Sequence, residues 1–185
     1  MSLNTAVRNW TSQRVWVVGA SSGIGLALAQ ALISLGARVA VSARRAEPLL
    51  ALASAHPQQV LALPLNMTEN ADWDSAWNNI NSAWQGADWV VFCAADYTPI
   101  RAWELNRDRA AQLIDINFTG TLRGVATVLP DFLARGSGGI AIVASVAGYM
   151  GLPKSLVYGP TKAALINFAE SLYLDVKPKG LDVCV

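Results

Sequence analysis

The chain has 185 residues, of which 53% are hydrophobic and 15% are charged, and its formal net charge at pH 7 is +1. This length and apolar content exclude a disordered tail, and the small net charge excludes the strong electrostatic field of a protein that binds nucleic acid or anionic membranes. The apolar runs at residues 15–18 and 89–95 are too short to span a bilayer, and the polar N-terminus lacks the apolar stretch of a secretion signal. We therefore expect a cytoplasmic protein that binds no nucleic acid and no membrane.

Short β-branched runs alternate along the chain with longer segments of helical period. Strands are expected at residues 15–19, 38–43, 60–65, 89–93, 139–145 and 181–185. Helices are expected at residues 23–35, 48–55, 70–84, 101–133 and 156–176. Several strands are apolar on both faces, which is typical of a parallel sheet covered by helices on both sides. The pattern, with no repeat or proline-rich linker, predicts one α/β domain over residues 1–185 with a doubly wound parallel sheet in three α/β/α layers.

The first strand-to-helix connection carries the glycine-rich stretch "VVGASSGIGLALA". In a parallel sheet this position offers the free amides of a helix N-terminus to the pyrophosphate of a dinucleotide. Gly19 allows a sharp turn, Gly23 allows the phosphates to approach the backbone, and Gly25 allows the helix to pack closely on the sheet. The other residues of this turn expected to bind the cofactor are Ser21, Ser22 and Ile24. The spacing G-x-x-x-G-x-G by itself also fits a tight turn that binds nothing.

A second candidate cluster lies near the other end of the chain, in "SVAGYMGLPKSLVYGPTKAAL". Tyr158 and Lys162 stand four residues apart, so both side chains lie on one face of the expected helix. Ser145 closes the preceding strand at the same edge of the sheet. A neighbouring ammonium stabilises a phenolate, so the pair predicts a tyrosine that exchanges protons near neutral pH.

Together, "GASSGIG", Asn117, Ser145 and "YGPTK" resemble the short-chain dehydrogenase/reductase family, and the order of elements agrees from residue 13 to residue 185. The resemblance implies a Rossmann-type fold that binds NAD or NADP and transfers a hydride between the nicotinamide and a small carbonyl or alcohol. It implies that Tyr158 is the general acid/base, and that Lys162 stabilises its phenolate and binds the nicotinamide ribose. It also implies that Ser145 holds the substrate oxygen and that Asn117 positions a water linked to Lys162.

The residues after the second expected strand, in "VAVSARRAEPL", bear on the choice of cofactor. A carboxylate there binds the ribose of NAD, but this chain has Ala43 followed by Arg44 and Arg45, which favours NADP over NAD. We expect Arg44 to bind the 2′-phosphate, assisted by Ser42 or Ser21, because a guanidinium matches phosphate oxygens in a bidentate manner. The alternative is that both arginines are solvated loop charges.

Several positions depart from the family pattern. Its N-N-A-G after the fourth strand is replaced by residues 92–95 or by residues 93–96, within "FCAAD", and Ala94 is expected to lie against the cofactor there. Val18 replaces a threonine, and Asn66 replaces an aspartate, although its amide carbonyl still accepts a hydrogen bond from the adenine amino group. Family members also continue beyond this last strand, so the resemblance predicts a chain truncated after its sixth strand, with an open sheet edge and weak or absent turnover.

Aromatic residues suggest a core and a pocket. Trp73, Trp77 and Trp84 fall on one helical face and are expected to pack on the sheet. Tyr97 and Trp103 follow the fourth strand and are candidates to line a pocket for an apolar ketone. The helices at 101–133 and 156–176 resemble the family's dimer helices, which predicts a homodimer or homotetramer.

Cysteine and histidine, the residues typical of zinc sites, are few in this chain. Cys93 and Cys184 have no metal-site spacing, and His56 is the only histidine, so we expect no metal site. We interpret both thiols as small buried hydrophobic groups.

Two functional classes remain open. The first is an NADP-dependent reductase or dehydrogenase that uses Tyr158, Lys162, Ser145 and Asn117. The second is a catalytically silent NAD(P)-binding sensor or regulatory protein. A serine hydrolase is not supported, because G-x-S-x-G and a histidine near a nucleophile are lacking.

Overall fold

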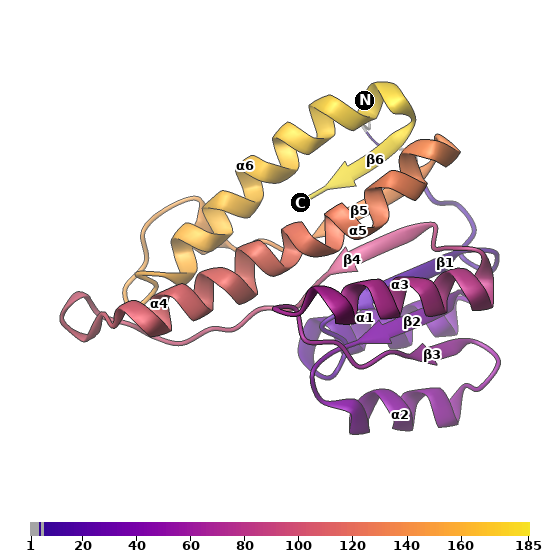
Figure 1. Cartoon of the computed structure of the whole chain (residues 1–185), viewed down its shortest axis with the longest axis horizontal. Coiled ribbons are helices and arrows are strands. Elements are labelled where there is room, and N and C mark those ends of the chain that lie inside the picture. Colours follow the sequence, from indigo (N-terminus) through magenta and orange to yellow (C-terminus); the bar gives the residue numbers. More distant parts are fainter. Residues whose placement is uncertain (1–3, 5) are drawn as a thin grey trace.

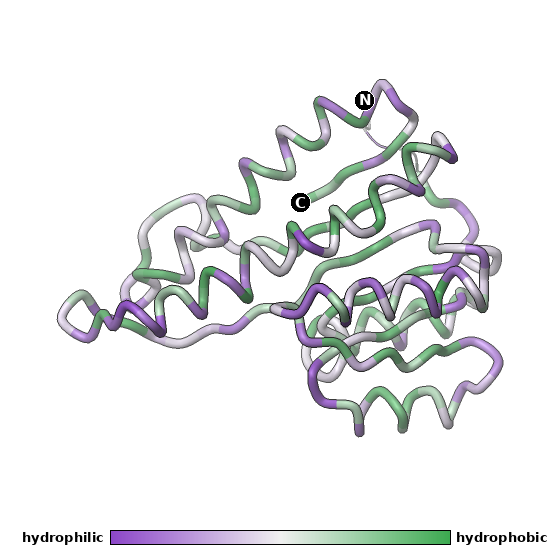
Figure 2. The backbone as a smooth tube through the Cα atoms, in the orientation of Figure 1, coloured by the Kyte–Doolittle hydropathy of each residue, from purple (hydrophilic) through white to green (hydrophobic). Residues whose placement is uncertain are grey.

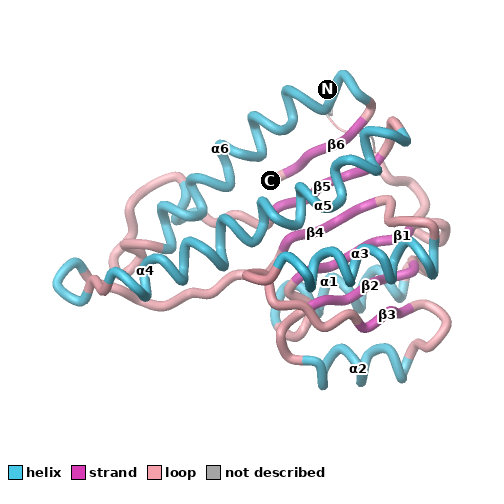
Figure 3. The backbone as a smooth tube through the Cα atoms, in the orientation of Figure 1, coloured by secondary structure: helices cyan, strands magenta, loops and turns pink. Residues whose placement is uncertain are grey.

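A computed structural model describes residue 4 and residues 6–185. Its centre is a six-stranded sheet in the order β3-β2-β1-β4-β5-β6, with every neighbouring pair parallel. The strands are β1 (Arg14–Val18), β2 (Arg38–Ser42), β3 (Val60–Ala62), β4 (Trp89–Phe92), β5 (Gly138–Ile142) and β6 (Leu181–Cys184). The α-helices are α1 (Gly23–Ser34), α2 (Ala46–Ala55), α3 (Asn70–Trp84), α4 (Arg107–Ile114), α5 (Gly120–Arg135) and α6 (Tyr158–Val176) (Figure 3). The predicted doubly wound α/β fold is confirmed.

The strands bury both of their faces, as their continuous apolar character predicts. Successive side chains of a strand point to opposite faces, so Trp16 and Val18 pack with α3, α5 and α6, whereas Val15 and Val17 pack with α1 and α2. Figure 2 shows mainly hydrophobic residues along the strands, whereas hydrophobic and hydrophilic residues alternate along the helices. The chain therefore forms three layers, with helices on both sides of the sheet.

Tryptophans make up much of the core on the α3 side. Trp73 and Trp77 are 1% and 6% exposed, as expected, and Trp84 is half-buried against the same cluster. The Trp16 ring stacks on Trp77 with ring centroids 6.0 Å apart and meets Trp73 edge-on at 5.6 Å. Trp16 also fixes a neighbouring strand, because its Nε1 donates to the Oγ of Ser42.

The long helix expected at residues 101–133 is instead divided. A short turn, η1 (Ala102–Glu104), precedes α4, which begins at Arg107 because the Asn106 side chain accepts from two backbone amides of the first turn. A π-helical segment, η2 (Asp115–Thr119), then separates α4 from α5. Such a segment inserts one residue into the helical register and is frequent at functional sites.

The predicted strands extend too far at their carboxyl ends. Residues 63–65 and 143–145 are apolar or small but lie outside β3 and β5. Regular strand pairing ends before them, although the Leu63 and Val143 amides still donate to the neighbouring strands, and Leu65 and residues 143–145 line a cavity. Hydrophobicity alone does not distinguish such a segment from a strand. The cysteine prediction is also wrong in part, since Cys184 is exposed on β6 and Cys93 is only half-buried.

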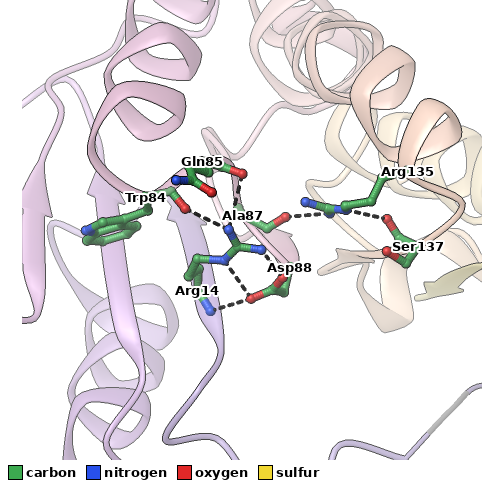
Figure 4. Close-up of polar contacts among 7 residues, drawn as sticks. All are labelled: Arg14, Trp84, Gln85, Ala87, Asp88, Arg135 and Ser137. Atoms are coloured by element: carbon green, nitrogen blue, oxygen red, sulfur yellow. Dashed lines mark hydrogen bonds and ion pairs between the residues drawn. The ribbon is translucent and has the colours of Figure 1, made fainter.

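The amino ends of the strands are joined by an ionic clasp around Arg14 (Figure 4). The Arg14 guanidinium contacts the Asp88 carboxylate at 2.5 Å and 3.0 Å and donates to the carbonyl oxygens of Trp84 and Gln85. Arg135 donates to the carbonyl oxygens of Ala87 and Ser137. The clasp thus connects β1, the loop before β4, and the end of α5.

No helix in the described part of the chain is long and apolar enough to cross a membrane.

Candidate active site

A cavity of about 760 Å³ opens at the carboxyl ends of the strands. It lies where the strand order reverses, because the chain runs outward from β1 to β3 and then returns to β4 on the other side of β1. Ligands of open α/β sheets bind at this switch point. In Figure 1 the arrowheads of β4 and β6 point toward the side where α6 begins. The helix that carries Tyr158 therefore starts at the same end of the sheet as the glycine-rich turn.

Most of the predicted site residues line this cavity. They are Gly19, Ser21, Ser22, Ile24, Gly25, Arg44, Asn66, Ala94, Ser145, Tyr158 and Lys162. Three predicted residues, Gly23, Ser42 and Asn117, are not among the residues that line it. The cavity therefore brings together segments from both ends of the sequence.

Backbone packing explains two of the three glycines in the turn. Gly19 has a φ of +95°, and a Cβ built on it would lie 2.4 Å from the Ala94 nitrogen. A Cβ on Gly25 would lie 2.3 Å from the Gly19 carbonyl oxygen. Gly23 has a φ of +56° with no described atom within 4 Å of its Cβ position. Gly19 and Gly25 thus allow close backbone approach within the fold, whereas within the fold Gly23 is required for its left-handed conformation. The approach of phosphates to Gly23 stays a prediction.

The N-terminus of α1 borders the cavity with Ser22, Ile24 and Gly25. Ser22 is the N-cap residue, but its side chain makes no capping hydrogen bond to any described residue. The first amides of a helix have no intrahelical partner, and together with the helix dipole they form an anion site. This part of the site therefore fits the diphosphate of a dinucleotide.

Tyr158 and Lys162 lie one helical turn apart at the start of α6. Lys162 is 2% exposed, and its Nζ donates to the Val143 carbonyl oxygen at 2.7 Å. The same Nζ lies 5.6 Å from the centroid of the Tyr158 ring. Burial lowers the pKa of Lys162 to about 8, and the nearby Cys93 thiol acts in the opposite direction. The lysine is therefore a buried cation that titrates close to neutral pH.

Ser145 and Cys93 border the same space from two neighbouring strands. Ser145 follows β5, and its Oγ accepts a hydrogen bond from the Ala147 amide at 3.2 Å, so its hydroxyl hydrogen is free to point toward a ligand. Cys93 follows β4, where its amide completes the ladder to the Val18 carbonyl oxygen. Burial raises the pKa of the Cys93 thiol, which Lys162 opposes. The pocket wall therefore offers one hydroxyl donor and one neutral thiol.

Asn117 holds a loop of the site together. It lies in η2 with no exposed surface. Its Oδ1 accepts from the Asp96 amide at 2.7 Å, and its Nδ2 donates to the Asp96 carbonyl oxygen at 2.8 Å. These two bonds anchor the loop after β4, a function that the sequence did not reveal because residues 96 and 117 are far apart in the chain. A water contact of Asn117 stays a prediction.

The prediction for Ser42 is corrected. Ser42 is fully buried, and its Oγ accepts from the Trp16 indole at 2.9 Å, so it faces the α3 side of the sheet and not the cavity. The alternation of β2 contains this signal, because Ser42 lies two residues after the buried Ala40 and shares its face. A serine in this position satisfies the tryptophan N–H within the core.

Two arginines in the loop after β2 line the cavity. Arg45 lies near Ser21, with its Nη2 3.4 Å from the Ser21 Oγ and 3.5 Å from the Ser21 carbonyl oxygen. Arg44 is exposed and lines the cavity. Sequence reasoning did not identify the Arg45–Ser21 contact, which depends on how the two loops meet.

Comparisons with known sequences and with solved structures indicate the same protein family. The family model described as short chain dehydrogenase matches residues 13–185. The chain is 33% identical over 172 residues to "Uncharacterized oxidoreductase Lmo0432" of Listeria monocytogenes, covering 90% of this chain and 68% of that protein. It is 32% identical over 182 residues to dehydrogenase/reductase SDR family member 7 of Mus musculus, covering 94% of this chain and 54% of that protein.

A solved structure agrees with these relatives. The crystal structure of a short-chain dehydrogenase from Streptomyces avermitilis superposes with a TM-score of 0.89 at 30% identity. The match covers 93% of this chain but 63% of that one. The chain thus spans less than two thirds of the length of this structural neighbour and about half of the mouse relative.

Proposed function

This chain belongs to the short-chain dehydrogenase/reductase family, and from that premise we propose that it transfers a hydride between NADP and a small carbonyl or alcohol. The observation that carries the proposal is the shared cavity, in which Tyr158 and the buried Lys162 lie together with the glycine-rich turn. A cavity of about 760 Å³ is large enough for a dinucleotide's reactive end and a small substrate.

The residues present fit a nicotinamide dinucleotide. The free amides of α1 and the close Gly19–Gly25 approach form the diphosphate cradle. Asn66 and Ala94 line the same cavity, Ala94 against Gly19, and would hold the adenine and the ribose. When bound in its reduced form, the nicotinamide supplies the hydride for a carbonyl carbon.

The chain's own residues then handle the oxygen of the substrate. The Ser145 hydroxyl donates a hydrogen bond to the carbonyl oxygen, and the Tyr158 hydroxyl donates the proton that completes the alcohol. The Lys162 ammonium, held at the Val143 carbonyl, stabilises the phenolate that Tyr158 leaves. In the oxidation direction the same phenolate accepts the proton of the alcohol.

The preference for NADP depends on Arg44. No carboxylate follows β2, where Ala43 stands, and the exposed Arg44 borders the cavity. Arg45 instead contacts Ser21 and positions the loop. We expect Arg44→Asp to lower NADPH affinity more than NADH affinity by at least about tenfold, since it replaces an attraction for the 2′-phosphate with a repulsion. Equal loss for both cofactors, measured by fluorescence titration, would contradict this assignment.

The reductase assignment is tested with Tyr158→Phe, which removes only the phenolic oxygen. Carbonyl-dependent NADPH oxidation should fall by about 10²- to 10⁴-fold, the usual contribution of a general acid, while NADPH binding persists. Tyr173→Phe, in the second half of α6 and outside the residues that line the cavity, is a matched control that should leave both unchanged. A chain that binds NADPH but oxidises it with no carbonyl of a broad panel is instead a dinucleotide sensor or regulatory protein.

We also propose that the chain forms a homodimer or homotetramer through α4, α5 and α6. An apolar groove of about 500 Å³ lies between α4, η2 and the start of α6, and its lining includes the exposed residues Leu105, Ile114 and Leu156. Exposed apolar surface of this kind marks interfaces. Ile114→Glu should convert the oligomer to a monomer in light-scattering measurements. An unchanged mass for that variant would contradict the interface.

A further inference from the structure

An aromatic ring outside the proposed catalytic set touches Tyr158. Tyr97 lies in the loop between β4 and η1, and its ring meets the Tyr158 ring edge-on, with centroids 5.0 Å apart and an interplanar angle of 77°. Tyr97 is nevertheless 53% exposed. Half of this ring is therefore available to a molecule that approaches the hydroxyl of Tyr158.

The residues on both sides of Tyr97 are fixed by polar contacts. The Asp96 backbone exchanges two hydrogen bonds with Asn117, and the Asp96 carboxylate pairs with Arg109 at 3.0 Å. Arg109 also donates to the Thr98 Oγ1. Together these contacts hold a half-exposed ring against the acid/base tyrosine, although the ring itself adds little to the core.

A second set of contacts fixes the far end of the loop that carries Tyr97. The Ile100 amide donates to the Lys154 carbonyl oxygen at 2.9 Å, and Ile100 bridges to Ser155 in the segment before α6. Ile100 is 5% exposed, so it anchors the loop in a small apolar cluster with Leu113 and Val157. The Tyr97 loop and the start of α6 therefore form one unit, and the ring keeps its place relative to Tyr158.

The loop of Tyr97 carries two charged side chains. The carboxylate of Asp96 is paired with Arg109, and the Arg101 guanidinium lies over the Trp103 ring, 5.3 Å from its centroid, so the one carboxylate of this loop is neutralised. On the neighbouring segment, directly after Ser145, the side chains of Val146, Tyr149 and Met150 are 71%, 75% and 66% exposed. Tyr149 and Met150 line a second hollow of about 380 Å³. Clustered exposure of apolar groups is typical of a binding surface.

We propose that the site selects uncharged aryl ketones or aldehydes, and that Tyr97 is the residue that determines this preference. The inference rests on the proposed reductase function and extends it to a substrate class. With the carbonyl oxygen at Tyr158 and Ser145, the aryl group lies against the exposed half of the Tyr97 ring, where offset or edge-to-face contact is favourable. The phenol oxygen of Tyr97 has no part in this contact.

The test is equilibrium binding of two matched ketones to the NADP⁺-saturated chain, in which no reaction occurs because both partners are oxidised. Acetophenone and cyclohexyl methyl ketone have nearly the same size, but only the first is aromatic. By calorimetry, Tyr97→Ala should weaken acetophenone binding by about tenfold and should narrow the difference between the two ketones. Tyr97→Phe should bind both as the wild type does. Leu174→Ala, which removes a more exposed apolar side chain from α6 outside the residues that line the cavity, is the control and should change neither.

The outcomes separate the two proposals. Unchanged acetophenone binding in Tyr97→Ala, or equal binding of both ketones by the wild type, overturns the role of Tyr97 and leaves the reductase function standing. Selective, Tyr97-dependent acetophenone binding without any NADPH-driven reduction supports the aryl site and overturns the reductase function. Where turnover is measured, Tyr97→Ala should raise KM for acetophenone with little change in kcat.

Discussion

Charged side chains at the two ends of the sheet differ in whether they have a counter-ion. At the amino end, Arg14 and Asp88 form a close ion pair with further backbone partners, and both are partly shielded from solvent. At the carboxyl end, Lys162 is almost fully buried with a carbonyl oxygen as its hydrogen-bond partner and no ion pair to any described carboxylate.

The pKa directions express the same contrast. Burial raises the pKa of Asp88, but the hydrogen bonds and charge of Arg14 outweigh it, so the net shift is downward. For Lys162 burial prevails and the pKa falls to about 8. A charge whose partners are all within the fold stabilises the structure, whereas a charge left without a counter-ion is available to chemistry. The comparison therefore indicates that the carboxyl end of the sheet is the functional end.

At the carboxyl end, the largest loss of unfolding free energy is expected from Gly19→Ala. The methyl group would lie 2.4 Å from the Ala94 nitrogen in a left-handed backbone, so the variant should lose about 3 to 5 kcal/mol of unfolding free energy. Gly23→Ala has the same backbone strain but no described atom within 4 Å and should lose only about 1 kcal/mol. Urea unfolding of the two variants measures the difference. Equal losses would show that strain, and not the close approach to Ala94, accounts for the effect.

The missing counter-ion of Lys162 predicts an unusual pH dependence. The folded pKa is about 8 and the reference value is 10.5, so below pH 8 the folded chain carries the full cost of a buried cation. That cost disappears as the pH rises toward 10.5, because the unfolded chain then holds more protons. Relative to Lys162→Met, the wild type should gain about 3 kcal/mol of unfolding free energy over this window. A constant difference between the two chains would contradict it.

The rate of NADPH oxidation should fall as the pH rises, whereas the unfolding free energy should increase. Above pH 8 the folded chain loses the ammonium that stabilises the Tyr158 phenolate, so the NADPH oxidation rate should fall while the stability of the chain rises. Parallel pH profiles of rate and of unfolding free energy, recorded on the same preparation, measure both. A rate that rises with stability through pH 9 would show that the charged form of Lys162 is not needed.

The amino-end clasp should affect stability alone. Arg14→Leu should lower the unfolding free energy by about 1 to 3 kcal/mol, because it leaves Asp88 partly buried and unpaired, and NADPH affinity should not change. The folded pKa of Asp88 is lowered, so the contribution of the pair is complete above pH 4 and fades as the pH falls through the folded pKa. A loss of NADPH affinity in Arg14→Leu would remove the distinction between the two ends.

The smallest effect is expected at the pair that holds the Tyr97 loop. Arg109 and Asp96 are each partly exposed, so Arg109→Ala should cost less than about 1 kcal/mol of stability. It should nevertheless raise KM for acetophenone a few-fold, since the Tyr97 ring loses its support. Arg109→Lys retains the charge and should restore part of the effect. Identical KM values for all three chains would show that the contacts of Asn117 and Ile100 fix the loop without Arg109.

Local patterns were sufficient to predict most of the fold. The alternation of apolar runs gave the six strands in order, and the period of residues 70–84 gave α3 with its observed bounds. The spacing of Tyr158 and Lys162 placed them on one helical face, and the glycine-rich turn placed a cradle at the first crossover. Each of these signals lies within a window of a few residues, so no distant contact was needed.

Distant contacts account for what the sequence did not reveal. The π-helical segment contains Asn117, whose side chain is bound to Asp96 in another loop, and no local period marks such a break. The Tyr97–Tyr158 contact likewise joins two crossovers. Ser42 is different, because the alternation with Ala40 already indicated that it faces the core.

The most direct test of hydride transfer follows a label and does not need fast turnover. The chain is incubated with NADPH deuterated at both C4 positions and with a panel of small aliphatic and aryl ketones, and the alcohols are analysed by mass spectrometry. The account predicts an alcohol with one deuterium on its carbinol carbon, formed by the wild type and lost in Tyr158→Phe. Unlabelled alcohol, or none from a chain that binds NADPH, would contradict it.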